Sequence, residues 1–153
     1  MFQAKAQSLL ELLLSIAVGV IMIGGSVLLM STSLRSYQDI KHKVTANSLL
    51  RQQDEIIISL AQDNWHSIGD LTPNTNYYAT STNNLWTVAS GQEEGIVNNV
   101  SYKRYFKVFS VYRDSNGNIS GSGTIDPNTL KVISFIEYGL NYNSSSSLTF
   151  YLT

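Results

Sequence analysis

An apolar stretch from Leu9 to Met30 constrains this 153-residue chain more than any other feature of its sequence. A helix needs about 20 predominantly apolar residues to cross a bilayer, and this stretch is long enough. Its only charged residue is Glu11. Because a charge at the membrane centre costs roughly 2.5–3.5 kcal/mol, a carboxylate inside such a stretch requires an explanation.

Three interpretations of this stretch compete. A secretory signal peptide has an apolar core of about 7–15 residues followed by a small-residue cleavage site, but this core is longer and the residues after Met30 fit such a site poorly. A plain membrane anchor accounts for the length, with Glu11 at the interface, and gives the carboxylate no role. The third interpretation uses the order of the residues before and around Glu11.

A short hydrophilic leader, Met1 to Ala6, precedes the sequence QSLLELLLSIAV, which begins at Gln7. This arrangement resembles the class III signal of type IV prepilins and pseudopilins. The resemblance implies that a prepilin peptidase cuts between Ala6 and Gln7 and that the new amine of Gln7 is methylated. Glu11 then becomes the fifth residue of the mature chain. Ala6 stands where the family usually has Gly, and Gln7 where it often has Phe.

The resemblance also implies a role for the carboxylate. In a filament of this family, Glu11 of one subunit would form a salt bridge with the Gln7 amine of a neighbour, and each charge would offset the desolvation of the other. The implied partners are other pilin subunits, the prepilin peptidase, the inner-membrane assembly platform and membrane lipid. DNA uptake is a further role of such filaments that nothing in this sequence supports.

The helical pattern continues beyond the apolar stretch. Residues 31–62 contain no Pro and no Gly, and apolar residues recur at helix-like intervals among charged ones. We therefore expect one helix from about Ser8 to Gln62. Its first part, residues 7–30, is the expected membrane and polymerisation segment, residues 31–62 are its amphipathic continuation, and residues 1–6 are the leader.

Residues 63–153 have the composition of a β-rich globular domain. Strands are expected at 84–90, 100–113, 130–138 and 147–153, with a hairpin turn at 113–118, and the segments 63–78 and 141–147 are expected to be loops. In the second strand, Arg104, Phe106 and Val108 should share one face, and Tyr105 and Val111 the other. The expected fold is α+β: the long helix packed on an antiparallel sheet of about four strands. Segments such as WTVASGQE, YKRYFKVFSVYRDSNG and DPNTLKV are similar to minor-pilin sequences.

The sequence offers little for catalysis or metal binding. It has no Cys, only two His and a net charge of -1, which argues against a disulfide framework, a Cys-based zinc site and a strong nucleic-acid footprint. Asp114 near Gly117 fits a turn better than a calcium loop, because the distal Glu of such a loop is missing. The pair Glu93 and Glu94 fits a solvated loop, and His66 fits a helix C-terminal residue beside a packed Trp65.

These observations favour a structural subunit, a minor pilin or pseudopilin, over an enzyme, and we expect no cofactor and no metal. Such a subunit would sit in the bacterial inner membrane before assembly and in a surface or extracellular filament afterwards. A single-span membrane-anchored adhesin or binding module that does not polymerise is the alternative. The sequence leaves open whether the role is adhesion, DNA uptake, motility or secretion.

Overall fold

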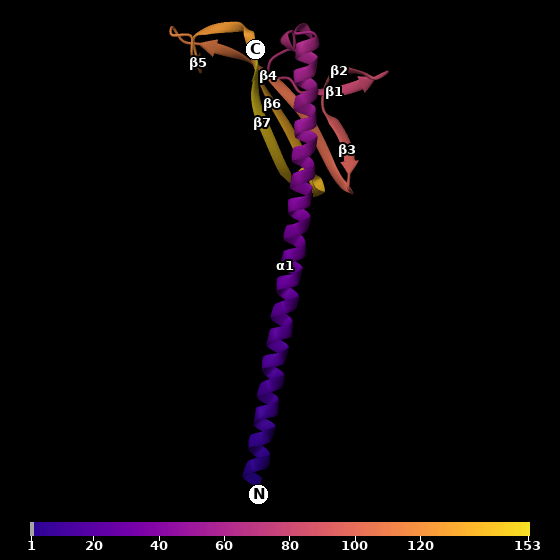
Figure 1. Ribbon diagram of the computed structural model, residues 1–153, viewed down its shortest axis with the longest axis vertical. Coiled ribbons are helices and arrows are strands. Elements are labelled where there is room, and N and C mark those ends of the chain that lie inside the picture. The colour runs from indigo at the N-terminus through magenta and orange to yellow at the C-terminus, as the bar shows by residue number, and fades with distance from the viewer. Residues whose placement is uncertain (1) are drawn as a thin grey trace. The chain divides into compact units, whose positions relative to one another are not determined.

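A computed structural model describes the backbone of residues 2–153 and the side chains of residues 11–139 and 141–153. The fold is α+β, as expected, with one long helix and one antiparallel sheet (Figure 1). The elements in chain order are α1 (Phe2–Asp63), α2 (His66–Gly69), β1 (Tyr77–Thr82), β2 (Leu85–Ser90), β3 (Glu93–Val97), β4 (Val100–Arg113), β5 (Ile119–Ser120), β6 (Thr124–Tyr138), the 3₁₀ helix η1 (Leu140–Tyr142) and β7 (Ser144–Leu152).

The chain divides into two compact units, residues 1–41 and residues 42–153, and α1 contributes residues to both. Residues 2–41 of the first unit are helical throughout, which agrees with the absence of Pro from this part of the sequence. The second unit contains residues 42–63 of α1 and the whole sheet. The last part of the helix therefore belongs to the globular unit.

The sheet is built around the long pair β4 and β6. Its strand order is β2-β1-β4-β6-β7 with antiparallel neighbours, while β3 and β5 also pair with β4. β4 and β6 pair in register from Tyr102 opposite Tyr138 to Ser110 opposite Leu130, and the register shifts between Ser110 and Val111. Residues 127–129 of β6 have no partner in β4 at this point, so the irregularity is a large bulge in β6.

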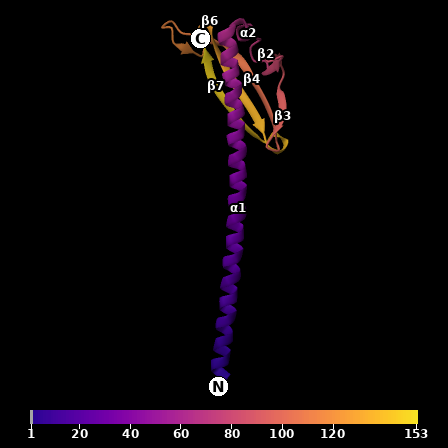
Figure 2. The ribbon, with the colours of Figure 1, turned by 45° about the vertical axis from the view of Figure 1, so that its right-hand side comes forward.

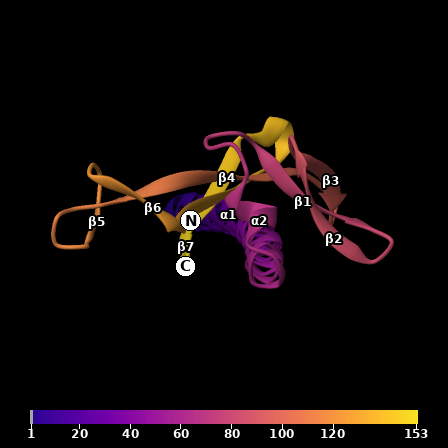
Figure 3. The ribbon, with the colours of Figure 1, turned by 90° about the horizontal axis from the view of Figure 1, so that it is seen from above.

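Residues 42–63 of α1 pack on one face of the sheet, beside β4, β6 and β7 (Figure 2). No α-helix of the described chain lies over the opposite face (Figure 3). The helix contributes a stripe at intervals of three and four residues, as expected for one buried face. The stripe consists of Ala46, Leu50, Gln53, Ile57 and Ala61.

Alternate residues of the central strands complete the core. Phe106, Val108, Val132 and Ile136 are fully buried against the helix stripe. Full burial of such an apolar side chain stabilises the fold by roughly 1.5–3 kcal/mol. The predicted shared face of β4 is confirmed for Arg104, Phe106 and Val108, which are all buried. Val111, predicted on the other face, is buried as well and lies outside the core clusters that contain the helix residues.

The prediction of about four strands was too low, because the sheet has seven in the described chain. β1, β3 and β5 were missed, and Glu93 and Glu94 lie in β3, not in a loop. β7 begins at Ser144 and not at Ser147, because the serines pair with the last residues of β6. Short polar segments have weak intrinsic strand preference, and the open edges of a neighbouring strand decide whether they pair.

Candidate functional site

The predicted processing site lies at the beginning of α1. The backbone of Ala6 and Gln7 is helical. Their side chains, and Met1 entirely, lie outside the described residues. Cleavage between Ala6 and Gln7 and methylation of Gln7 therefore stay predictions.

Glu11 is the first residue whose side chain the structure describes, and it is exposed on α1. Its backbone carbonyl accepts a hydrogen bond from the Ser15 hydroxyl at 2.8 Å, one helical turn further along. The carboxylate has no ion-pair partner among the described residues. The predicted salt bridge to a Gln7 amine needs a second copy of the chain and stays a prediction.

The helix around Glu11 exposes an apolar surface on all sides. Large apolar side chains between residues 12 and 30 are half to three-quarters exposed. Among the described residues, α1 is the one helix long and apolar enough to cross a membrane. These side chains are Leu12, Leu13, Leu14, Ile16, Val18, Val20, Ile21, Met22, Ile23, Val27, Leu28, Leu29 and Met30.

This apolar surface indicates membrane anchoring, because an exposed apolar area of this extent in water is a site of association. Ser15, Ser26 and Thr32 do not interrupt it, since each hydroxyl bonds a carbonyl of the preceding turn. Such bonds keep a polar side chain satisfied inside hydrocarbon. The stretch can be covered by lipid or by the apolar surface of other helices.

The globular unit contains a buried ionic network that the sequence did not reveal. The Arg104 guanidinium donates to the Glu93 carboxylate at 2.6 Å and to the Leu49 carbonyl oxygen at 3.1 Å. It also donates to the Gln52 side-chain oxygen at 3.3 Å, and the Tyr102 hydroxyl donates to Glu93 at 3.1 Å. The network joins β3, β4 and α1 and fixes the helix on the sheet. It is therefore structural.

Three further polar residues lie between the two apolar clusters of the core. The Ser134 hydroxyl on β6 donates a hydrogen bond to the Asp54 carboxylate on α1. Burial raises the pKa of Asp54 to about 6, although the hydrogen bond from Ser134 lowers it. Gln53 is fully buried, and neither polar atom of its amide has a hydrogen-bond partner among the described residues.

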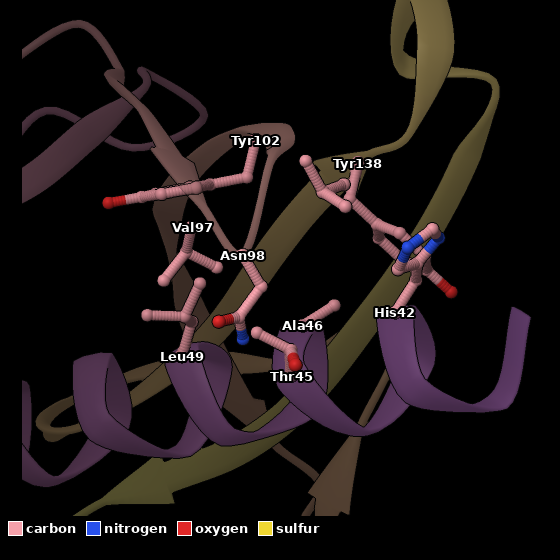
Figure 4. Close-up of a pocket in the computed structure, with 9 residues that line it drawn as sticks. His42, Thr45, Ala46, Leu49, Val97, Asn98, Tyr102 and Tyr138 are labelled. Atoms are coloured by element: carbon pink, nitrogen blue, oxygen red, sulfur yellow. The ribbon is translucent and has the colours of Figure 1, made fainter. Parts of the chain in front are cut away.

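A small hollow lies between α1 and the hairpin that joins β3 to β4. The space in it that a water molecule could occupy is only about 10 Å³. Figure 4 shows Val97 and Asn98 of the hairpin near Leu49 and Ala46 of the helix. The residues that line it are His42, Thr45, Ala46, Leu49, Val97, Asn98, Val100, Tyr102 and Tyr138. A hollow of this size is too small for a substrate, and its lining contains no carboxylate and no Lys or Arg.

The remaining candidate residues take part in surface contacts, core packing or a turn. His66 begins α2 and does not end α1 as predicted, and its Nδ1 lies 3.2 Å from Asp70 Oδ2 at the surface. Trp65 packs against the core, as predicted. The Asp114 carboxylate accepts backbone N–H bonds from Asn116 and Asn118, both at 2.9 Å, so it holds the predicted turn and its pKa is lowered. The described residues include no His, Asp and Glu group that could hold a metal ion.

We compared the chain with protein-family models, with curated protein sequences and with solved structures, and none of the three comparisons gave a match.

Proposed function

We propose that this chain is a structural subunit, a minor pilin or pseudopilin, of a type IV pilus or a type II secretion-like filament. In this proposal a prepilin peptidase removes residues 1–6 and the apolar part of α1 then mediates polymerisation. The chain is not an enzyme. It is held in the inner membrane before assembly, and its globular unit is presented on the filament surface.

The observation that carries the proposal is the position of Glu11. This carboxylate follows the expected cut by five residues and begins an apolar helix surface that is exposed all round. In a lipid-free bundle of such helices, a lone carboxylate would be strongly destabilising. A neighbouring Gln7 amine of opposite charge would remove that penalty and would fix the axial register between subunits.

The α+β fold agrees with this role without requiring it. Residues 42–63 of α1 form the spine of the globular unit, and the sheet packs on that spine. The polar contacts described above hold the helix and the sheet in one register. A unit of this kind can be carried by a polymerising helix because its core does not depend on the apolar stretch.

The intact mass and the N-terminal sequence of the native protein test the processing step. We expect the mature chain to begin at methylated Gln7. The Glu11→Ala variant should be cut at the same place and should remain in the membrane fraction without entering filaments. Glu55→Ala is the matched control, because Glu55 is an exposed glutamate of the same helix that lies within the globular unit.

Two results would contradict the proposal. A native chain that keeps Met1 would exclude prepilin processing and would favour the single-span adhesin or binding module. Filaments that incorporate Glu11→Ala as well as Glu55→Ala would show that the carboxylate has no role in assembly.

A further inference from the structure

The sheet ends in two edge strands, β2 on one side and β7 on the other, each paired on its inner side only (Figure 1). An edge strand presents a row of N–H and C=O groups that can pair with a strand of another chain. Proteins usually block this pairing with charged side chains, Pro or bulges in the edge strand. The two edges of this sheet can be compared with that rule.

Neither edge is blocked. β7 has the sequence SSSSLTFYL, with no charge and no Pro, and all its residues pair with β6 without a shift in register. β2 has the sequence LWTVAS, also without charge or Pro, and it pairs regularly with β1. Both strands are therefore regularly paired on the inner side and neutral, and no strand of the described chain pairs with the outer side of either.

Exposed apolar side chains flank the two edges on the helix-covered face of the sheet. Leu148 of β7 lies opposite Ser134, which itself lies opposite Phe106 of the core, so Leu148 is on this face. Trp86 of β2 lies opposite Ser81 and shares the face of the buried Tyr77. Leu148 and Trp86 are each 41% exposed.

The opposite face of the sheet also exposes apolar side chains at both edges. Leu85 on β2 is 68% exposed and Tyr151 on β7 is 45% exposed. A strand added beside β7 would therefore meet apolar groups on both of its faces, and β2 carries apolar groups on both of its faces. Neither edge would bring a charge into a contact between the two strands, and each would place apolar side chains there.

The strand directions favour pairing between the two different edges over pairing of identical edges. Three strands, β1, β4 and β6, lie between β2 and β7, and all neighbours are antiparallel, so β2 and β7 run in the same direction. Parallel pairing of β7 with β2 of another copy leaves both copies in the same orientation. Antiparallel pairing of β7 with β7 would reverse the second copy and close into a two-fold dimer, whereas the filament of the proposed function repeats its subunits in one orientation.

We propose that β7 of one copy pairs in parallel with β2 of the next copy, so that the globular units form a continuous sheet. This contact is head-to-tail and open, and it extends into a chain of subunits and does not stop at a dimer. Parallel pairing is somewhat weaker than antiparallel pairing, but shared anchoring raises the local concentration of the copies. The proposal rests on the proposed function only for that shared orientation, and it does not depend on Glu11.

Cysteine cross-linking of the full-length chain tests this contact, because the natural sequence has no Cys. Thr87→Cys is combined in turn with Ser145→Cys, Ser147→Cys and Thr149→Cys. All four positions are exposed and lie on the face away from the helix. The variants are reconstituted in phosphatidylcholine vesicles and oxidised mildly. We expect at least one pair to give a ladder of dimers, trimers and larger species on non-reducing gels.

The controls separate specific pairing from random collision. Each single-Cys variant should remain monomeric, and Thr87→Cys with Ser115→Cys in the exposed 114–118 turn should give no ladder. Adding Leu148→Lys to the best pair should reduce cross-linking at least tenfold, because it places a charge in the contact. Far-UV circular dichroism verifies that each variant keeps its fold.

The proposed contact is wrong if none of the three Cys pairs gives a ladder. It is also wrong if the control pair, Thr87→Cys with Ser115→Cys, gives a ladder of equal intensity. A dimer from Ser147→Cys alone would indicate β7 paired with β7 and would also overturn it. The same preparations report on the proposed function through the N-terminal mass. A chain that begins at Gln7 and polymerises without cross-links refutes only the edge contact, whereas a ladder from a chain that keeps Met1 refutes only the pilin function.

Discussion

Arg104 Nε lies 2.6 Å from Glu93 Oε2, and this ion pair joins β4 to β3 beneath the helix. The Arg104 side chain is only 7% exposed and the Glu93 side chain 26%. Because the same guanidinium also reaches the Leu49 carbonyl oxygen, the pair connects the sheet to the helix as well as two strands to each other. The contribution of this ion pair to stability can be compared with that of the exposed pair Lys103–Glu94, which joins the same two strands.

Glu93→Ala should destabilise the globular unit strongly. The change leaves the Arg104 charge buried without its partner, and breaking a buried pair in this way costs about 3–5 kcal/mol. Glu94→Ala is the matched control, because Glu94 pairs with Lys103 at the surface and such pairs contribute about 0–1 kcal/mol. Urea unfolding of the full-length chain in detergent measures both free energies. Equal losses for the two variants would contradict this assignment.

Gln53→Leu should stabilise the globular unit. Gln53 lies in the buried helix stripe, and its amide has no hydrogen-bond partner among the described residues. An unsatisfied buried polar group costs about 1–3 kcal/mol, and Leu fills a similar volume without that penalty. The neighbouring Gln52→Leu should give no gain, because Gln52 is exposed and accepts a bond from Arg104. A lower unfolding free energy for Gln53→Leu would refute the prediction.

Asp54 should make stability depend on pH. Its pKa rises from 3.8 to about 6 in the fold, so the folded chain holds the proton more tightly than the unfolded chain. The stabilisation from this group is therefore complete below pH 3.8 and is lost as the pH rises through about 6. Thermal unfolding of the wild type and of Asp54→Asn between these limits measures the effect.

The wild-type melting temperature should fall relative to Asp54→Asn as the pH is raised through this range, and the difference should be constant at higher pH. Asp63→Asn is the control, because Asp63 is an exposed aspartate of the same helix. Parallel pH curves for wild type and Asp54→Asn would show that the carboxylate does not hold its proton in the fold.

Gly69→Ala should destabilise the junction between α1 and the sheet. A Cβ atom at Gly69 would lie 2.6 Å from Trp65 Nε1, closer than atoms can approach, so the indole ring would have to move out of its place against the core. Overpacking of this kind costs about 1–3 kcal/mol. Gly121→Ala should be nearly neutral, since no atom lies within 4 Å of its Cβ. Trp fluorescence during denaturation compares the two variants.

The regular parts of the fold were predictable because their sequence patterns are long. The helix was expected from Ser8 to Gln62 and spans Phe2–Asp63, and the strand expected at 100–113 has those bounds in β4. The turn at Asp114–Asn118 was also correct, because Asp and Gly form such turns locally, with Gly117 at a φ of 82°. β1 and β3 were missed although each forms a two-residue hairpin with the next strand along the chain. The hairpin loops are Asn pairs at 83–84 and 98–99 with positive φ, a local signal that the prediction did not use.

The candidate site was likewise predictable only in part. The sequence placed a lone carboxylate, Glu11, in an apolar stretch, and the structure adds that the surrounding side chains are exposed. It did not place Arg104 beside Glu93 or Ser134 beside Asp54, since these residues are brought together only by strand register and helix packing. No periodicity in the chain encodes which polar residues meet across that interface.

The sequence by itself determined the apolar helix, its single carboxylate, the α+β class and the principal turns, because each depends on residues close together along the chain. Tertiary structure alone decided the break in register between β4 and β6, the ionic network under the helix and which strands form the two edges of the sheet. These features depend on which segments meet in space. Whether a sheet edge pairs and whether a charge is buried depend on the segments that pack against them in the fold, and not on the local sequence.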